Sequence, residues 1–459
     1  MPRRSRGTRS ITLSAVELEP VQPTPPVEAL PRLRTFVSPF TGVVHGIDET
    51  LAAPDEHRLV SIACEVADGR PTVGEPVEGH AAAEHPLREG AVAASIGEAL
   101  ERYSASFVPA HRIVVCSADG LPGTVEPARF ALFHEAQHAD PAFPFRPFRR
   151  DTVVGWVAGF ALPGGEPAYL PAPLVFLSRG PRSPDEERIA YTTSSGLACG
   201  ATLEEALLAG LLEQIERDAV MLVWYDRLSL PLLDWSRDPE LVRIDARYFA
   251  PTGLEYAAVD LSVFFGVPTV LGVVRGAPGV LGALGVGAAS ASTVDVAWRK
   301  ALAEAFTVQR WVRDHALERP EDIDRSAAEI QSFDGHTMFY AHPDRAARAA
   351  FLDRSPERRD TRDIAALEGS NVLERIEAVC DSLARHHVSA YGVDVTSPDV
   401  RSAGLHVVRV IAPELCQLDV VERARFLGGE RLYQAAYSAG LVTGALTPPD
   451  LNPDPHPFP

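Results

Sequence analysis

One arrangement of charged residues occurs twice in this chain. The sequence ExxER stands at residues 98–102 and again at residues 213–217. Successive residues of an α-helix are about 100° apart, so both glutamates of each motif fall on one side of a helix. The glutamate and arginine at positions i and i+4 are also spaced to form an ion pair, as on many exposed helices. An exposed ion pair and a functional carboxylate site are therefore both open for each motif.

The surroundings of the second motif favour a functional site. It lies within ALLAGLLEQIERDAVMLVW, which is apolar nearly all round and predicts a buried helix. A buried carboxylate must be paired, protonated or bound to a metal, because an isolated charge is costly to bury. Glu205, Glu213 and Glu216 fall within a sector of about 80° on this helix. Clustered glutamates suit Mg²⁺, which often bridges carboxylates and nucleotide phosphates.

Several familiar catalytic patterns are missing from the sequence. It contains no GxxxxGK[ST] phosphate loop, no GxSxG and no kinase signature. Gly285-Val-Gly287 lacks the third glycine of a dinucleotide fingerprint, so a close-packed turn is predicted there. The five cysteines are scattered without a CxxC pair, which predicts reduced, mostly buried thiols. Cys199 precedes the second acidic helix, but no histidine pattern supports a nucleophile, so a packed thiol is favoured.

The C-terminal segment alternates proline with other residues. Prolines stand at 453, 455, 457 and 459, a spacing that imposes a polyproline II-like strand of about 3.1 Å per residue. A solvated tail or a ligand for an SH3-like module is the generic interpretation of such a segment. Here His456 and Phe458 are interleaved, and the sequence stops at Pro459 with a terminal carboxylate.

Three strong helices are predicted to hold the acidic residues, over 90–105, 203–224 and 293–317. Thr202 is the expected N-cap of the second helix. Loops and short helices are expected over 318–363 and a closing helix over 422–440. Together with the predicted strands, the pattern indicates a mixed α/β (α+β) fold; the strands are expected at 33–44 (with a turn at Ser38–Pro39), 112–116, 153–161, 168–170, 256–259, 268–275, 388–394 and 406–411.

Composition narrows the class of protein. The formal net charge is −19, and no basic cluster stands out beyond Pro2–Arg9, which argues against a nucleic-acid surface. The most apolar stretch, 267–289, is interrupted by Arg275 and Pro278, so no membrane span is predicted. Residues 1–32 are polar and proline-rich and are predicted to be a flexible arm. We therefore expect a soluble, cytoplasmic protein.

Three segments resemble the YcaO superfamily, and within it the D protein of azoline-forming cyclodehydratases in thiazole/oxazole-modified peptide biosynthesis. They are SIGEALERYSA, SSGLACGATLEEALLAGLLEQIERDA and the closing PDPHPFP. The resemblance covers residues 33 to 459. It implies a YcaO domain over 33–446 and a proline-rich tail over 447–459 that enters the active site.

The resemblance also implies an ATP site without a phosphate loop, lined by acidic helices. Glutamates would hold Mg²⁺ and phosphates, and other residues would contact the nucleotide. The implied metal ligands are Glu98, Glu101, Glu205, Glu213 and Glu216; the further nucleotide contacts are Ser38, Arg102, Arg217, Lys300 and Glu304. The tail, with Pro455 and Pro457, would position the substrate and supply a proton acceptor through His456 or the Pro459 carboxylate. The sequence departs from the family pattern at Ala94, Ser195 and Ala201.

In the activity that the resemblance implies, a Cys, Ser or Thr side chain of a precursor peptide attacks the preceding amide. ATP then phosphorylates the amide-derived oxygen, and loss of phosphate leaves a thiazoline or (methyl)oxazoline. No segment resembles a leader-binding domain, so an E1/ThiF-like leader-binding partner is expected. A downstream flavin dehydrogenase and a homodimer are also compatible with the resemblance. Two alternatives stay open: a YcaO enzyme that forms a thioamide or amidine, and a non-catalytic scaffold subunit.

Overall fold

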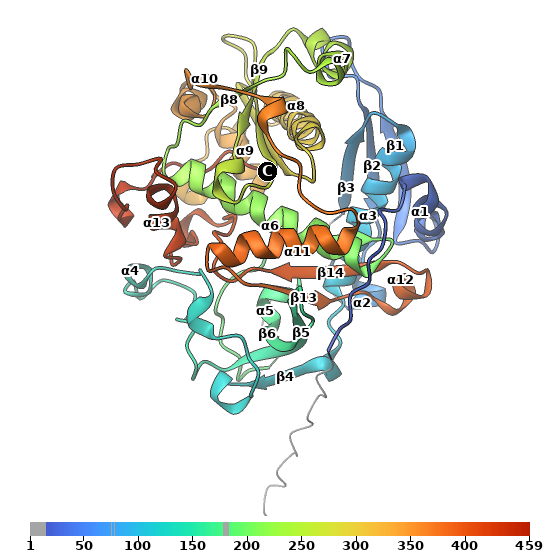
Figure 1. Ribbon diagram of the computed structural model, residues 1–459, viewed down its shortest axis with the longest axis vertical. Helices are drawn as coiled ribbons and strands as arrows, with labels where there is room; N and C mark the ends of the chain where they lie inside the picture. Colours follow the sequence, from blue (N-terminus) through green and yellow to red (C-terminus); the bar gives the residue numbers. More distant parts are fainter. Residues whose placement is uncertain (1–14, 75, 78, 178–182) are drawn as a thin grey trace, which may run out of the picture.

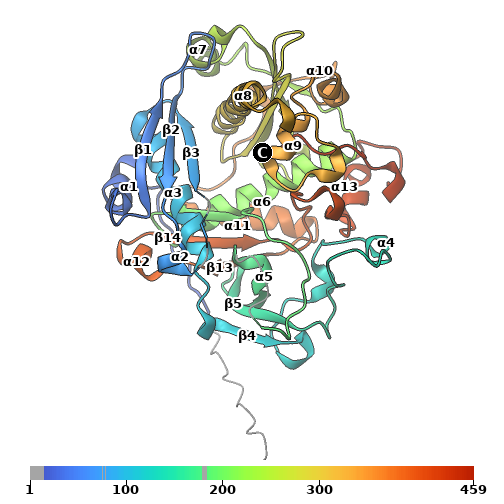
Figure 2. The ribbon, with the colours of Figure 1, turned by 180° about the vertical axis from the view of Figure 1, so that it is seen from behind.

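The computed structural model has three β-sheets, and a long central helix, α6 (Leu203–Tyr225), lies between two of them (Figures 1 and 2). The structure describes residues 15–74, 76–77, 79–177 and 183–459. The mixed α/β class predicted from the pattern is confirmed. Among the helices of the described ranges, none combines the length and the hydropathy needed to cross a bilayer.

The first sheet has three antiparallel strands in the order β1-β2-β3, formed by Val44–Thr50, Val60–Val66 and His80–His85. Helix α3 (Arg88–Ser106) packs on β2 and β3 and carries the first ExxER motif. Helix α1 (Pro26–Leu33) packs on α3 in turn. None of these three strands was predicted.

The second sheet has the order β11-β10-β9-β8-β12, and only the pairing of β12 with β8 is parallel. Helix α8 (Val294–Glu318) lies across β10 and β11 (Figure 1). A Cβ atom at Gly285 would lie 2.3 Å from the carbonyl oxygen of Ala305 on α8. The glycines around 285 thus allow close packing, as predicted, but within a strand and not a turn. The strands are β8 Leu232–Asp234, β9 Glu255–Asp260, β10 Thr269–Arg275, β11 Leu284–Ser290 and β12 Arg358–Asp360.

The third sheet has the order β4-β5-β13-β14-β7, with β6 added beside β5. Its pairings are antiparallel, including that of β14 with β7 just before α6. Helix α11 (Val372–Arg385) packs on α6. The strands are β4 Ile113–Cys116, β5 Val154–Leu162, β6 Pro167–Pro171, β7 Leu197–Gly200, β13 Ala390–Asp394 and β14 His406–Ile411.

Helix α6 is buried because it lies between the second and third sheets, contacting β10 and β11 on one side and β7 and β14 on the other. Its capping box is formed by Thr202, which accepts from the amide of Glu205, and by the Glu205 carboxylate, which accepts from the amide of Thr202. Burial of each leucine or valine on such a helix stabilises the fold by about 1.5–3 kcal/mol. Thr202 is confirmed as the N-cap.

The remaining helices are short and lie mostly at the periphery (Figure 1). They are α2 Arg70–Val73, α4 Glu135–His138, α5 Ala172–Val175, α7 Pro239–Tyr248, α9 Phe333–Phe339, α10 Pro343–Ala346, α12 Pro398–Ser402 and α13 Arg431–Ser438.

Three predictions of local structure are wrong. Residues 26–33 form α1, with Leu30 and Leu33 buried, so the predicted flexible arm does not extend over them; residues 1–14 lie outside the described part. The segment 34–43 is a short 3₁₀ turn and a loop, and a strand begins only at Val44, although the turn after Ser38 is present. The closing helix is limited to α13, because residues 425–430 are not helical.

Candidate active site

A cavity of about 310 Å³ is lined by residues of α3, α6 and α8 and by the last residue of the tail. Side chains from both ExxER motifs line it, although the two motifs are more than a hundred residues apart in sequence. Its lining is Glu98, Glu101, Arg102, Ser194, Ser195, Leu197, Glu213, Arg217, Glu304, Phe333, Leu418 and Pro459.

Five glutamates in and beside this cavity share one mode of attachment. Each accepts a hydrogen bond, on one carboxylate oxygen, from a backbone amide in or next to a strand. Such a bond holds the carboxylate in place and leaves its second oxygen for other partners. The pairs are Ala82 N to Glu98 (3.0 Å), Cys199 N to Glu101 (2.8 Å), Gly196 N to Glu213 (3.2 Å), Ser290 N to Glu216 (3.1 Å) and Ala288 N to Glu304 (2.7 Å).

The i,i+4 ion pairs expected from the motifs are present, but they are not on an exposed surface. Arg102 contacts Glu98 at 2.7 Å, and Arg217 contacts Glu213 at 3.5 Å. Arg217 also contacts Glu216 at 3.3 Å. Both arginines line the cavity, so each can neutralise its glutamates and still face a bound anion.

The carboxylates outnumber the cations around the cavity, and this raises their affinity for protons. Burial, followed by the charges of nearby glutamates, raises the pKa of Glu98 to about 7. Burial and the charge of Glu98 raise the pKa of Glu101 well above its usual range. Burial likewise raises the pKa of Glu216 and of Glu304, while Arg217 opposes both shifts. A bound cation would favour the ionised forms.

The donor set fits Mg²⁺ held jointly with a nucleotide. Within the described ranges, no three histidine, cysteine or acidic side chains are arranged as a ready metal cage. Mg²⁺ seldom uses such a cage, because it usually takes one or two carboxylates together with phosphate oxygens and water. Glu98, Glu101, Glu213 and Glu304 are the cavity residues that present carboxylates for this purpose.

Four of the residues expected to hold the metal or contact the nucleotide do not line the cavity. The Glu205 carboxylate is occupied at the start of α6, where it accepts from the amides of Thr202 (3.1 Å) and Thr24. Ser38 accepts from the amides of the turn that follows it. Glu216 is buried and does not line the cavity, but it contacts Arg217, which does. Lys300 is exposed, but its charge acts on Glu101 and Glu304.

The proline-rich tail is docked and does not extend into solvent. Its C-terminal end lies near the middle of both ribbon views (Figures 1 and 2). Trp224 Nε1 donates to the carbonyl of Asp454 (3.0 Å), and the hydroxyl of Tyr340 donates to the carbonyl of Pro455. Phe458 is 1% exposed. Of the tail residues, only Pro459 is among the residues that line the cavity within the described chain; Pro455, His456 and Pro457 are buried beneath it.

The contacts of His456 do not suit the expected role of proton acceptor. Its Nε2 lies 2.8 Å from the carbonyl oxygen of Asp419, which can only accept, so Nε2 carries the proton. Its Nδ1 accepts from the amide of Phe458 at 3.2 Å. Burial, followed by the neighbouring His336, lowers the pKa of His456 well below its usual range. The ring is neutral and both nitrogens are occupied, so it holds the tail in place.

Some cavity residues were not predicted as site residues. Ser195 is a departure from the family pattern, and Ser194 precedes it; both line the cavity. Ser95, which stands beside a position where the family commonly has serine, is buried and donates to the carbonyl of Ala81 (3.1 Å). Cys199 contributes its amide, while burial and Glu101 raise the pKa of its thiol, as expected for a packed side chain. Phe333 and Leu418 carry no sequence signal, because they reach the cavity only through long-range folding.

Solved structures match the described fold over most of the chain. A heterocyclase in complex with substrate and cofactor matches 97% of this chain with a TM-score of 0.80 and 22% identity, and this chain covers 59% of that one. YcaO from Methanopyrus kandleri, bound with AMPPCP and Mg²⁺, matches 88% with a TM-score of 0.61 and 21% identity, over 94% of its own chain. The E. coli microcin synthetase McbBCD complex with pro-MccB17 bound matches 80% with a TM-score of 0.55 and 13% identity, over 88% of its chain.

At these identities the likeness is one of fold, and the fold is that of the heterocyclases. An uncharacterised protein of Methanothermobacter thermautotrophicus is 30% identical over 209 residues, which are 44% of this chain and 50% of that protein. The chain thus spans about half the length of this curated relative. Residues 86–416 match the sequence model described as YcaO cyclodehydratase, ATP- and Mg²⁺-binding. The chain belongs to the YcaO family, which confirms the resemblance drawn from its motifs.

Proposed function

We propose that this chain catalyses the ATP- and Mg²⁺-dependent cyclodehydration of Cys, Ser or Thr residues in a precursor peptide to azolines. One observation carries the proposal. The glutamates of both ExxER motifs and Pro459 of the proline-rich tail line the same cavity. This shared lining supports the proposal, because the acidic motifs would bind the nucleotide phosphates at the same site where the amide oxygen is to be phosphorylated.

The residues of the chain have distinct tasks in this reaction. The anchored carboxylates of Glu98, Glu101, Glu213 and Glu304 hold Mg²⁺, and Arg102 and Arg217 face the nucleotide phosphates. Bound Mg-ATP supplies the phosphoryl group that turns the amide oxygen into a leaving group. The docked tail closes the cavity at Pro459 and so positions the peptide and excludes water.

The peptide substrate reaches this site, on our proposal, with the help of a separate E1/ThiF-like protein that captures the leader segment. A related arrangement supports this: the E. coli microcin synthetase was solved as a complex of several proteins with its peptide bound. Oxidation of the azoline to an azole would belong to a further flavin enzyme.

Mass spectrometry of a precursor peptide incubated with the chain, a leader-binding partner and Mg-ATP tests the proposal. We expect each ring formed to remove the mass of one water and to consume one ATP. A reaction without ATP and a reaction with Glu101→Gln serve as controls. Exchange of an oxygen for sulfur would indicate a thioamide-forming enzyme instead. Binding of the partner without Mg-ATP turnover would indicate a scaffold.

A further inference from the structure

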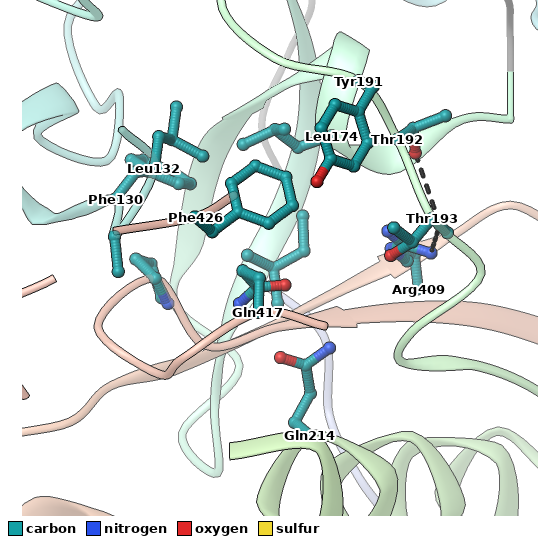
Figure 3. A pocket seen from close by; sticks show the side chains of 13 residues that line it. Phe130, Leu132, Leu174, Tyr191, Thr192, Thr193, Gln214, Arg409, Gln417 and Phe426 are labelled. Carbon is teal, nitrogen blue, oxygen red and sulfur yellow. Dashed lines mark hydrogen bonds between the residues drawn. The ribbon is translucent and has the colours of Figure 1, made fainter. Parts of the chain in front are cut away.

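A second, smaller cavity has a buried arginine side chain, that of Arg409, in its wall (Figure 3). Its volume is about 30 Å³, and most of its wall is apolar or aromatic. Arg409 of β14 and Gln214 of α6 supply its polar side, together with Thr193 and Gln417 (Figure 3). We call it the Arg409 pocket; its lining is Phe130, Ala131, Leu132, Leu174, Tyr191, Thr192, Thr193, Gln214, Arg409, Ile411, Pro413, Gln417 and Phe426.

The guanidinium of Arg409 is buried without a matching anion. Its side chain is 5% exposed, and one terminal nitrogen donates to the carbonyl of Thr193 at 2.7 Å. Its Nε has no hydrogen-bond partner, and Arg409 forms no ion pair with a carboxylate of the described chain. Glu213 acts on it only from farther away, and burial lowers the pKa of Arg409 to about 10. A buried charge without an ion pair and with an unpartnered N–H is costly in free energy unless a ligand accepts a hydrogen bond from it.

Gln214 is in a similar state. It is 3% exposed, and its amide makes no hydrogen bond to any other part of the chain that the structure describes. Its side chain points into the same pocket as that of Gln417 (Figure 3). The Nε of Arg409 and the side-chain amide of Gln214, which lack hydrogen-bond partners in the described chain, thus belong to two residues that line one small space.

The pocket selects the kind of ligand by charge and size. Only an oxygen acceptor satisfies Arg409 and Gln214 together. About 30 Å³ admits roughly two water-sized groups, which suits a carbonyl group better than a phosphate. The aromatic and aliphatic wall suits the carbon atoms attached to that carbonyl.

Several residues that line the pocket are next in sequence to residues that line the active-site cavity. Thr192 and Thr193 line the pocket, whereas Ser194 and Ser195, the next residues, line the cavity. Gln214 likewise follows Glu213, which lines the cavity. The hydroxyl of Thr193 donates to that of Ser195 at 3.2 Å. The lining of the pocket is therefore in direct contact with the lining of the active-site cavity.

We propose that the Arg409 pocket binds a backbone carbonyl of the peptide substrate, at a residue next to the one that is modified, with Arg409 and Gln214 donating to its oxygen. The proposal rests on the proposed function in taking the substrate to be a peptide. In this role Arg409 and Gln214 are substrate-positioning residues, and their bonds align the reacting amide with the nucleotide.

The test is peptide binding, measured separately from turnover. The probe is N-acetyl-Gly-Cys-Gly-amide, followed by ligand-observed NMR on the full chain with Mg²⁺ and a non-hydrolysable ATP analogue. We expect Arg409→Met and Gln214→Met to weaken probe binding about tenfold or more, and to leave the affinity for the ATP analogue unchanged. Arg112→Met is the matched control, because Arg112 also donates to a backbone carbonyl, that of Asp394, but does not line the pocket.

Each outcome decides the proposal. Unchanged probe binding in folded Arg409→Met or Gln214→Met protein overturns it, as does an equal loss in Arg112→Met. Absence of probe binding to the wild-type chain, or binding of acetate alone, overturns it as well. If Arg409→Met does not fold, Gln214→Met decides alone. If the variants lose binding but the wild-type chain forms no azoline from a precursor, the pocket proposal stands and the proposed reaction fails.

Discussion

At the scale of single residues, the site depends on carboxylates that are each held at one oxygen by a backbone amide. Glu101 shows the principle: the amide of Cys199 holds one oxygen, and burial raises the pKa of the group. A glutamine at this position keeps an acceptor for the amide but loses the negative charge. Charge and position can therefore be separated by one substitution.

We expect Glu101→Gln to fold normally and to lose Mg-ATP turnover by about 100-fold or more, because it removes a charge aimed at the metal and phosphates. The measurement is phosphate release with precursor peptide present. Glu205→Gln is the control, since the Glu205 carboxylate accepts from the amides of Thr202 and Thr24 and does not line the cavity. Wild-type turnover in Glu101→Gln would indicate that the first ExxER motif has only a structural role, through the ion pair of Glu98 and Arg102.

His456 is a second case in which position and chemistry can be separated. An asparagine here can still accept from the amide of Phe458, two residues later, as asparagines do in turns, but it cannot take up a proton. We expect His456→Asn to keep most of the cyclisation rate and His456→Ala to lose most of it. The pH profile of kcat/KM should be unchanged in His456→Asn. If both variants are equally inactive and the acidic limb of the pH profile of kcat/KM is lost, the His456 ring acts as a base.

At the scale of elements, the tail is a docked segment without β-strand pairing. It contacts the end of α6, and its last residue lines the cavity. Asn452, Asp454 and Pro455 are held by groups on α6 and around Tyr340, and Phe458 fills an apolar space. The alternating prolines restrict the unbound tail, so less conformational entropy is lost on docking. Docking of the tail brings its last residue, Pro459, into the lining of the cavity.

We expect removal of Asp454–Pro459 to abolish cyclisation with far less loss of nucleotide binding, because the carboxylates and arginines stay in place. Product mass and the affinity for an ATP analogue are the two measurements. Pro453→Ala is the control, since Pro453 is exposed and the docked residues follow it. Full activity of the shortened chain would remove the tail from the mechanism.

At the scale of the whole molecule, the crowded carboxylates make stability depend on pH. The pKa of Glu98 is about 7 in the folded chain against 4.5 for an unperturbed glutamate, so the native state binds more protons than the unfolded state between these values. Its contribution to the free energy of unfolding is therefore present at low pH and is lost as pH rises through this window.

We expect the melting temperature of ligand-free wild type, relative to that of Glu98→Gln, to fall between about pH 5 and about pH 8. The comparison cancels the titration of other groups. Addition of Mg²⁺ with an ATP analogue should stabilise the wild type more at the higher pH, because the carboxylates are then ionised. Differential scanning fluorimetry across this range makes both measurements, and a constant difference between the two proteins would contradict the shift.

The sequence by itself was sufficient for the long helices and for most of the charged lining of the cavity. The helices that hold Glu98, Glu213 and Glu304 end within two residues of their predicted bounds. Helices are encoded locally, by contacts three and four residues apart and by caps such as Thr202. The three strands of the first sheet escaped prediction because their stability comes from pairing and from α3, not from local pattern.

Tertiary structure alone decided which groups meet. Spacing placed Glu205 and Glu213 on one face of α6, but only the fold shows that Glu205 is occupied by the cap and by Thr24. The proton position on His456 depends on Asp419, and the state of Arg409 depends on Thr193, more than two hundred residues away. Such contacts carry no local signal, because their partners become neighbours only when the chain has folded.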